Sequence, residues 1–101
     1  YDAVHNGEMD IVLAYSTDAR IQEYDLVMLE DDLNFFPPYD ASPVFLQETI
    51  DEYPEIADAI EPLIGLIDEE TMGTLNGEVD IHGKSVEEAA KDFLVDQGLL
   101  E

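Results

Sequence analysis

The sequence predicts an α/β fold in which short strands are followed by a helical C-terminal half. Two apolar runs in the first third of the chain, residues 10–15 and 26–29, are short, continuous and flanked by polar residues, which is typical of strands. From residue 46 onward, apolar residues instead recur every three or four positions, which is the period of an amphipathic helix. The 101 residues have room for one small domain at most.

The first apolar run is the segment around which we expect the rest of the fold to be organised. Residues 10–15 do not alternate between polar and apolar, as is typical of a strand buried on both faces of a parallel sheet. Tyr15 and the polar residues 16–18 would lie at its carboxyl end, where open α/β sheets bind ligands. Tyr15 is therefore a candidate site residue, although a tyrosine packed in a core fits the same pattern.

Short helical segments are expected on either side of this strand. Residues 1–4 are predicted to be the last turn of a helix that ends at Asn6 and Gly7, because glycine readily adopts the left-handed conformation found there. A chain that begins inside a helix is expected to be part of a longer one. Residues 16–18 can cap a short helix over residues 19–23, since Ser, Thr and Asp accept hydrogen bonds from free amides at a helix start.

A rigid segment with the sequence Phe-Phe-Pro-Pro-Tyr ends at Tyr39. Its two prolines fix φ and remove two N–H donors, so the segment must be extended. Residues 41–45 are predicted to continue as a strand, which Pro43 places at a sheet edge or at the strand start. A tyrosine on such a stiff support can present its ring face to a cation, but it can equally pack in a core.

Two capping boxes predict helix starts in the second half. Thr49 with Glu52, and Ser85 with Glu88, have the spacing at which the two side chains cap each other's backbone N–H groups. The helix after Ser85 is the best defined, and Gly98 is expected to end it. Its predicted apolar stripe consists of Val86, Ala89, Ala90, Phe93 and Leu94.

Two more helices are expected between these capping boxes. Pro54 suits the first position of a helix, which Gly65 limits. Asp68 is predicted to start the next helix, with Met72, Leu75 and Val79 facing inward. Residues 76–77, an Asn-Gly pair, could form either a hairpin turn or the end of this helix. We predict the helix end, because no strong strand precedes the pair.

The charge is extreme: 26 Asp and Glu residues against three Lys and Arg residues give a formal net charge of −23. Such a surface repels nucleic acids and anionic lipids. The normal and periodic apolar content argues against disorder. We interpret the sequence as that of a folded protein adapted to high salt, where charge repulsion is screened. An acidic protein from an ordinary environment is the alternative.

No pattern in the sequence indicates catalysis or a metal site. There is no cysteine, and His5 and His82 lack the spacing of a zinc motif. The acidic clusters at residues 30–32 and 68–70 lack the spacing of a calcium loop, so they are expected to be solvated. We find neither a nucleophile elbow nor a glycine-rich phosphate loop. We therefore expect a protein that is not an enzyme and holds no cofactor.

Three blocks of sequence resemble one known family. They are Tyr15-Ser-Thr-Asp-Ala-Arg-Ile21, Leu29-Glu-Asp-Asp32 and Phe35-Phe-Pro-Pro-Tyr-Asp-Ala-Ser-Pro-Val44. They resemble the C-terminal part of substrate-binding proteins of ABC importers for glycine betaine, choline, carnitine and related osmoprotectants. The resemblance implies part of a two-lobed, type II periplasmic-binding-protein-like fold that holds the quaternary ammonium group in a cage of aromatic rings. By this resemblance Tyr15 and Tyr39 are cage residues, and Thr17 is a candidate polar contact.

The same resemblance implies a domain organisation, partners and a location. Residues 1–34 would end one lobe, residues 35–45 would cross between lobes, and residues 46–101 would form the helical C-terminal part of the other lobe. The implied partners are a quaternary ammonium solute and an ABC permease subunit, at the outer face of the membrane with a lipid anchor, or in the periplasm. Since family members are longer, the chain is expected to carry at most half a site, and a homodimer would cover exposed strand edges.

A second hypothesis is a small acidic protein-interaction domain with no small-molecule ligand. Its carboxylate surface would bind a basic partner. Binding of that kind weakens steeply with ionic strength, whereas cage binding of a zwitterion changes little. Salt dependence therefore separates the two hypotheses.

Overall fold

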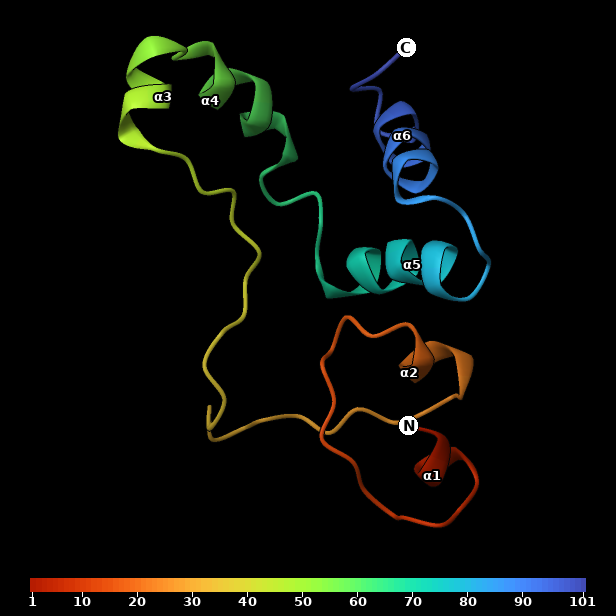
Figure 1. The fold of residues 1–101 in the computed structure, drawn as a ribbon. Coiled ribbons are helices and arrows are strands. Elements are labelled where there is room, and N and C mark those ends of the chain that lie inside the picture. The colour runs from red at the N-terminus through yellow and green to blue at the C-terminus, as the bar shows by residue number, and fades with distance from the viewer. The chain divides into compact units, whose positions relative to one another are not determined.

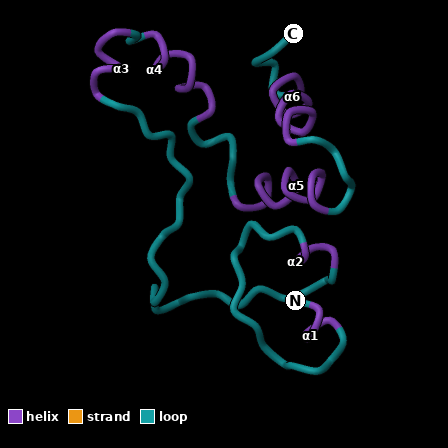
Figure 2. Tube along the Cα trace, viewed as in Figure 1, coloured by secondary structure: helices purple, strands orange, loops and turns teal.

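The computed structural model describes residues 1–101 and contains helices and loops but no strand (Figure 1, Figure 2). The chain divides into two compact units, one formed by Tyr1–Met28 with Gly65–Glu101 and the other by Leu29–Ile64. The elements are α1 (Asp2–His5), α2 (Arg20–Glu23), α3 (Gln47–Glu52), α4 (Glu55–Ile60), the 3₁₀-helix η1 (Glu61–Leu63), α5 (Glu69–Asp80) and α6 (Val86–Asp96).

The three predicted strands are wrong for this chain. Residues 10–15, 26–29 and 41–45 form no strand, and no backbone hydrogen bond joins one of these segments to another. A strand requires a neighbour whose N–H and C=O groups pair with its own, and an apolar run alone does not supply one. Ile11 and Val27 accordingly remain 70% and 86% exposed.

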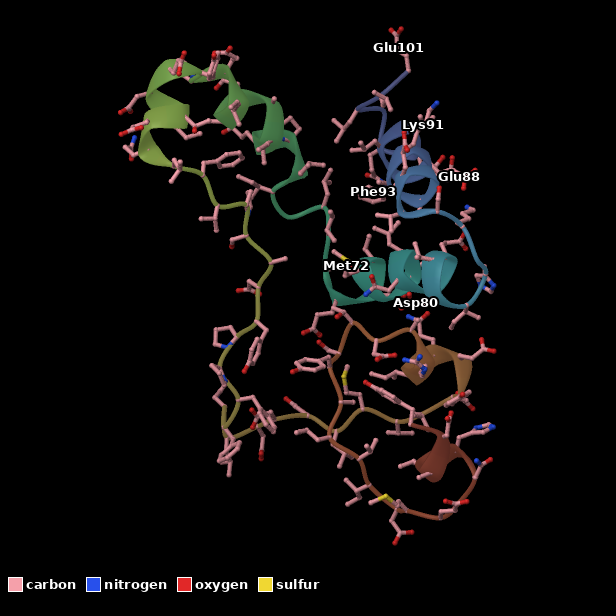
Figure 3. The ribbon with its side chains drawn as sticks, viewed as in Figure 1. Met72, Asp80, Glu88, Lys91, Phe93 and Glu101 are labelled. Carbon is pink, nitrogen blue, oxygen red and sulfur yellow. The ribbon has the colours of Figure 1, made fainter.

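Helices α5 and α6 contact each other in the first unit. The Asp68 carboxylate accepts a hydrogen bond from the Thr71 N–H at 2.8 Å and caps α5, as predicted. Met72 and Phe93, which Figure 3 labels, are half-buried, and Ala89 on α6 is buried. The apolar stripe predicted for α6 is thus confirmed in part.

The start of α6 is held by the predicted capping box. The Glu88 N–H donates to Ser85 Oγ at 3.2 Å, and the Ser85 N–H donates to Glu88 Oε2 at 3.1 Å. Just before this cap, the Lys84 ammonium lies 2.6 Å from Glu78 Oε2 and 3.1 Å from Asp92 Oδ2. One lysine therefore links the last turns of α5 to α6.

The predicted end of α5 at residues 76–77 is wrong, because the helix continues to Asp80. The chain turns instead at Gly83, whose φ is +76°. Asn and Gly are weak helix formers, but tertiary contacts outweigh propensity, and the contacts of Asn76 and Gly77 are described below.

In the second unit, the predicted capping box at Thr49 is also wrong. Helix α3 begins at Gln47, and the Thr49 N–H donates to the Leu46 carbonyl at 3.0 Å. Thr49 therefore lies inside the helix, where its backbone is satisfied without a side-chain cap. Pro54 is the N-cap residue of α4, one position before the predicted one.

Helices α1 and α2 are joined by an aromatic contact. The His5 and Tyr24 rings stack with their centroids 4.3 Å apart, and the Tyr24 hydroxyl donates to Asp2 Oδ1 at 2.6 Å. Gly7, with φ of +73°, follows α1 as predicted. These contacts hold α1 against the end of α2 in the N-terminal part of the first unit.

Burial is sparse throughout the chain. Only Ala19, Gly73 and Ala89 are buried, and none of the large apolar side chains is. A folded domain normally buries most of its Ile, Val, Leu and Phe side chains. This chain therefore leaves most of its large apolar side chains at least partly accessible.

Candidate functional site

The turn at residues 15–18 carries two of the three predicted site residues. The Asp18 N–H donates to the Tyr15 carbonyl at 3.0 Å, which closes the turn. The Tyr15 side chain is 70% exposed, and Thr17 is half-buried. The turn therefore presents the Tyr15 ring to the surface of the first unit.

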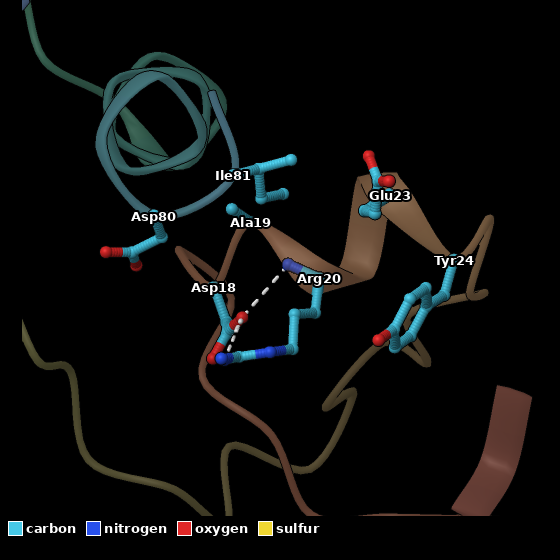
Figure 4. A pocket seen from close by; sticks show the side chains of 7 residues that line it. All are labelled: Asp18, Ala19, Arg20, Glu23, Tyr24, Asp80 and Ile81. Atoms are coloured by element: carbon cyan, nitrogen blue, oxygen red, sulfur yellow. Dashed lines mark hydrogen bonds and ion pairs between the residues drawn. The ribbon is translucent and has the colours of Figure 1, made fainter. Parts of the chain in front are cut away.

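Asp18 fixes the passage from this turn into α2. Its Oδ1 accepts a hydrogen bond from the Arg20 N–H at 3.0 Å and lies 3.6 Å from Arg20 Nη1 (Figure 4). The N-cap position itself is Ala19, which has no side-chain oxygen, so the carboxylate one residue earlier binds a free amide of the first turn. The predicted cap is thus confirmed for Asp18.

Helix α5 holds the same turn from a second direction. The Ser16 hydroxyl donates to Glu69 Oε1 at 2.9 Å, and Asn76 Nδ2 donates to the Thr17 carbonyl at 2.9 Å. A Cβ built on Gly77 would lie 3.6 Å from the Ala19 Cβ, so the helix backbone and Ala19 are close neighbours. The turn is therefore bound through its backbone and its small side chains.

Tyr1 holds the turn through its phenol group. Its hydroxyl oxygen accepts a hydrogen bond from the Tyr15 N–H at 3.4 Å, and the Asp18 carboxylate interacts with the same phenol. Burial and this carboxylate raise the pKa of the Tyr1 phenol above its ordinary value of 10.0. Tyr1 therefore contacts both ends of the turn as a neutral phenol.

Tyr39 lies in the other compact unit, and its side chain is 77% exposed. The segment that leads to it is anchored by Asp31, whose two carboxylate oxygens accept the N–H groups of Phe35 at 3.0 Å and Phe36 at 2.9 Å. The bonds from Phe36 and Phe35 lower the pKa of the Asp31 carboxyl. The structure thus brings Tyr15 and Thr17 into one turn and places Tyr39 in a different unit.

A small pocket of about 240 Å³ lies beside α2, and neither Tyr15 nor Thr17 lines it (Figure 4). Three of its residues carry carboxylates and one a guanidinium group, so its walls are net negative. The lining residues are Asp18, Ala19, Arg20, Glu23, Tyr24, Asp80 and Ile81.

Sequence reasoning missed the residues that hold the turn. Glu69, Gly73, Asn76 and Gly77 have the spacing i, i+4, i+7 and i+8, which places them on one face of α5. This polar and small face could have been found from the sequence, since it lies apart from the apolar positions of the same helix. The contribution of Tyr1 has no local signal of this kind.

No helix of the chain combines the length and the apolar character that crossing a membrane requires.

Comparison with known proteins identifies relatives over nearly the whole chain. The family described as the substrate-binding domain of ABC-type glycine betaine transport systems (OpuAC) matches residues 1–96. The carnitine transport binding protein OpuCC of Listeria monocytogenes is 45% identical over 94 residues, which are 93% of this chain and 30% of that protein. The glycine-betaine-binding protein of Pseudomonas aeruginosa is 38% identical over 101 residues, which are 100% of this chain and 32% of that protein.

A solved structure shows the same fold. A crystal structure of a glycine betaine/carnitine/choline ABC transporter matches with a TM-score of 0.91 and 42% identity, over 100% of this chain and 37% of that chain. This chain therefore spans about a third of the length of the proteins that it matches. The chain belongs to the family of substrate-binding domains of ABC-type glycine betaine transport systems.

Proposed function

We propose that this chain is part of the solute-binding protein of an ABC importer for quaternary ammonium osmoprotectants such as glycine betaine or choline. The single observation that carries this proposal is the family match over residues 1–96. The names of the relatives, which specify glycine betaine and carnitine, support the same class of ligand. A binding protein releases its solute unchanged, so the proposal includes no enzymatic step and no cofactor.

Within this function, we assign Tyr15 and Tyr39 to an aromatic cage and Thr17 to a polar contact beside it. Both tyrosine side chains are more than two-thirds exposed, at 70% and 77%, so each ring has area that a ligand can cover. A ring face attracts a cation through its quadrupole, by about 0.5–2 kcal/mol. The net charge of −23 adds a long-range attraction for cations.

The proposed whole protein has a two-lobed, type II periplasmic-binding-protein-like fold. Residues 1–34 end one lobe, residues 35–45 cross between lobes, and residues 46–101 form the helical C-terminal part of the other. Limited proteolysis with and without solute would identify the lobe boundaries.

We further propose that the complete protein delivers its solute to an ABC permease subunit at the outer face of the membrane, either lipid-anchored or in the periplasm. In the isolated chain, a second copy would cover exposed apolar side chains such as those of Leu13 and Val44, which are 78% and 90% exposed.

The test uses a hybrid protein, because this chain spans about a third of its relatives. Residues 1–101 replace the segment of the L. monocytogenes carnitine transport binding protein that they match. Isothermal titration with glycine betaine and choline should show binding, and Tyr15→Ala or Tyr39→Ala should each weaken it by about 2- to 30-fold. Phe at either position keeps the ring and should retain most of the affinity.

Two controls make this test specific. Tyr53→Ala removes a tyrosine that is 48% exposed outside the proposed cage, and it should leave the affinity unchanged. The neutral isostere 3,3-dimethylbutanol has the shape of choline without its charge and should bind more weakly. Unchanged affinity in both Tyr15→Ala and Tyr39→Ala would remove the cage from the proposal, and binding that collapses in molar salt would favour an acidic interaction surface.

A further inference from the structure

The turn that presents Tyr15 contains short polar residues, whose conformation depends on what holds them. In this chain the strand predicted before the turn does not form, so sheet pairing does not fix residues 10–15. Tyr15 itself is 70% exposed, so its ring is not fixed by burial. Contacts made by the backbone and by the small side chains of the turn help to hold its position.

Helix α5 supplies these contacts along one face. Glu69, in the first turn of the helix, binds the Ser16 hydroxyl at 2.9 Å, and Asn76, two turns later, binds the Thr17 carbonyl at 2.9 Å. The Asn76 bond is part-buried and joins residues 59 positions apart in the sequence. Two successive residues of the turn are thus tied to one rigid element.

Gly73 and Gly77 lie on the same face of α5, next to the turn. A Cβ on Gly73 would lie 3.8 Å from the Thr17 carbonyl oxygen, and a Cβ on Gly77 would lie 3.6 Å from the Ala19 Cβ. Figure 4 shows α5 nearly end-on with Ala19 beside it. The helix backbone thus lies close to the turn, and Asn76 reaches the Thr17 carbonyl directly.

We propose that Asn76 is a positioning residue for the solute site, because its side-chain amide sets the backbone of the turn that carries Tyr15 and Thr17. This inference rests on the proposed function, which assigns both residues to the solute. A preorganised turn loses less conformational freedom when the solute binds, so its anchor strengthens binding without touching the ligand.

The variant Asn76→Ala separates positioning from stability. It removes the amide donor but places a better helix former inside α5, so the unfolding midpoint should change little. In the hybrid protein described above, the affinity for glycine betaine should fall by about 2- to 10-fold, which corresponds to the loss of one hydrogen bond. Asn76→Asp keeps the shape and turns a carboxylate oxygen toward the carbonyl, so it should weaken binding at least as much.

A second readout needs no ligand. On the 101-residue chain, amide hydrogen exchange of Asp18, whose N–H closes the turn by donating to the Tyr15 carbonyl, should become faster in Asn76→Ala. The matched control is Gln47→Ala, which removes a side-chain amide bonded to Asp51 in the other unit. It should change neither the exchange of Asp18 nor the affinity.

The two readouts distinguish the possible failures. Unchanged exchange of Asp18 in Asn76→Ala overturns the positioning role, whatever the ligand result. Faster exchange with unchanged affinity in a hybrid that binds glycine betaine shows that the anchor does not serve the site and also overturns the inference. A hybrid that binds no quaternary ammonium solute overturns the proposed function instead, and exchange alone then decides whether Asn76 holds the turn.

Discussion

The guanidinium carbon of Arg20 lies 5.8 Å from the centroid of the Tyr1 ring. At this distance a cation is attracted by the ring face. The same Arg20 guanidinium is 3.6 Å from Asp18, whose carboxylate raises the pKa of the Tyr1 phenol. Three side chains from two parts of the sequence therefore stabilise one another beside the turn.

The first prediction concerns this cluster. Arg20→Met keeps most of the aliphatic stem but removes the charge, and it should lower the free energy of unfolding by about 0.5–1 kcal/mol, the value of an exposed cation–π contact. Urea unfolding followed by circular dichroism measures the change. Lys91→Met alters the net charge equally on α6, so an equal loss in both variants would show that net charge, and not the contact with Tyr1, is responsible.

The second prediction tests the start of α6. Ser85→Ala removes the oxygen that accepts the Glu88 N–H, and it should destabilise the helix by about 1 kcal/mol. Thermal unfolding followed at 222 nm measures the effect. Ser42→Ala, in a loop of the other unit, is the matched control and should change little. A capping role for Ser85 is excluded if the two variants melt alike.

The third prediction concerns two glycines with different backbones. Gly77→Ala should stabilise α5 by about 0.5–1 kcal/mol, because alanine is the better helix former and its methyl group would meet Ala19 at an ordinary distance of 3.6 Å. Gly83→Ala should destabilise the chain by about 1–2 kcal/mol, since φ there is +76°. Urea unfolding of both variants should show changes of opposite sign.

The fourth prediction concerns acid. The hydrogen bonds from Ser85 lower the pKa of Glu88 below its ordinary value of 4.5. A carboxyl group with a lowered pKa in the folded state stabilises the fold above its unfolded pKa, and this stabilisation is lost as the pH falls through the folded value. The stability difference between the unmodified chain and Glu88→Gln should therefore shrink as the pH falls below 4.5.

Hydrogen exchange of α6 amides between pH 7 and pH 3 measures this difference, after correction for the intrinsic exchange rate. Glutamine also completes a capping box, so the variant keeps the helix while removing the titrating group. Glu87→Gln changes the charge of the same turn outside the capping box and serves as the control. A pH-independent difference for Glu88→Gln would contradict the assignment.

The fifth prediction is a dependence on salt. Repulsion among carboxylates at a net charge of −23 opposes the compact state. The Debye length falls from about 30 Å at 0.01 M salt to about 3 Å at 1 M, so the melting temperature should rise clearly across this range of KCl. Sucrose at matched osmolality controls for effects other than screening, and an equal rise in sucrose would contradict adaptation to high salt.

The sequence predicts this fold well wherever the signals are local. The start of α6 follows from Ser85 and Glu88, three residues apart, and the turn after α1 follows from Gly7. The strand predictions fail at residues 10–15 because strand formation depends on a neighbour, which a hydrophobic pattern does not specify. Local chemistry is thus sufficient for caps and turns but not for sheet pairing.

The same distinction applies to the site. Residues 16–18 are predicted to cap a short helix over residues 19–23, and Asp18 does bind an amide of the α2 first turn. The anchors were not expected, because Tyr1 and Asn76 reach the turn across 14 and 59 residues of sequence. Asn76 was interpreted as a helix end from its neighbour Gly77, whereas α5 continues to Asp80 and the Asn76 side chain binds the Thr17 carbonyl from inside the helix.

The exposed apolar side chains have a consequence for how copies of the chain behave in solution. Each copy exposes residues such as Leu13 and Val27 and also carries a charge of −23. In dilute buffer, charge repulsion between copies keeps these apolar surfaces apart, so the chain stays in solution. Salt ions that screen the repulsion among carboxylates within one molecule also screen the repulsion between molecules. The salt that best compacts the chain is therefore also the salt in which it most readily associates.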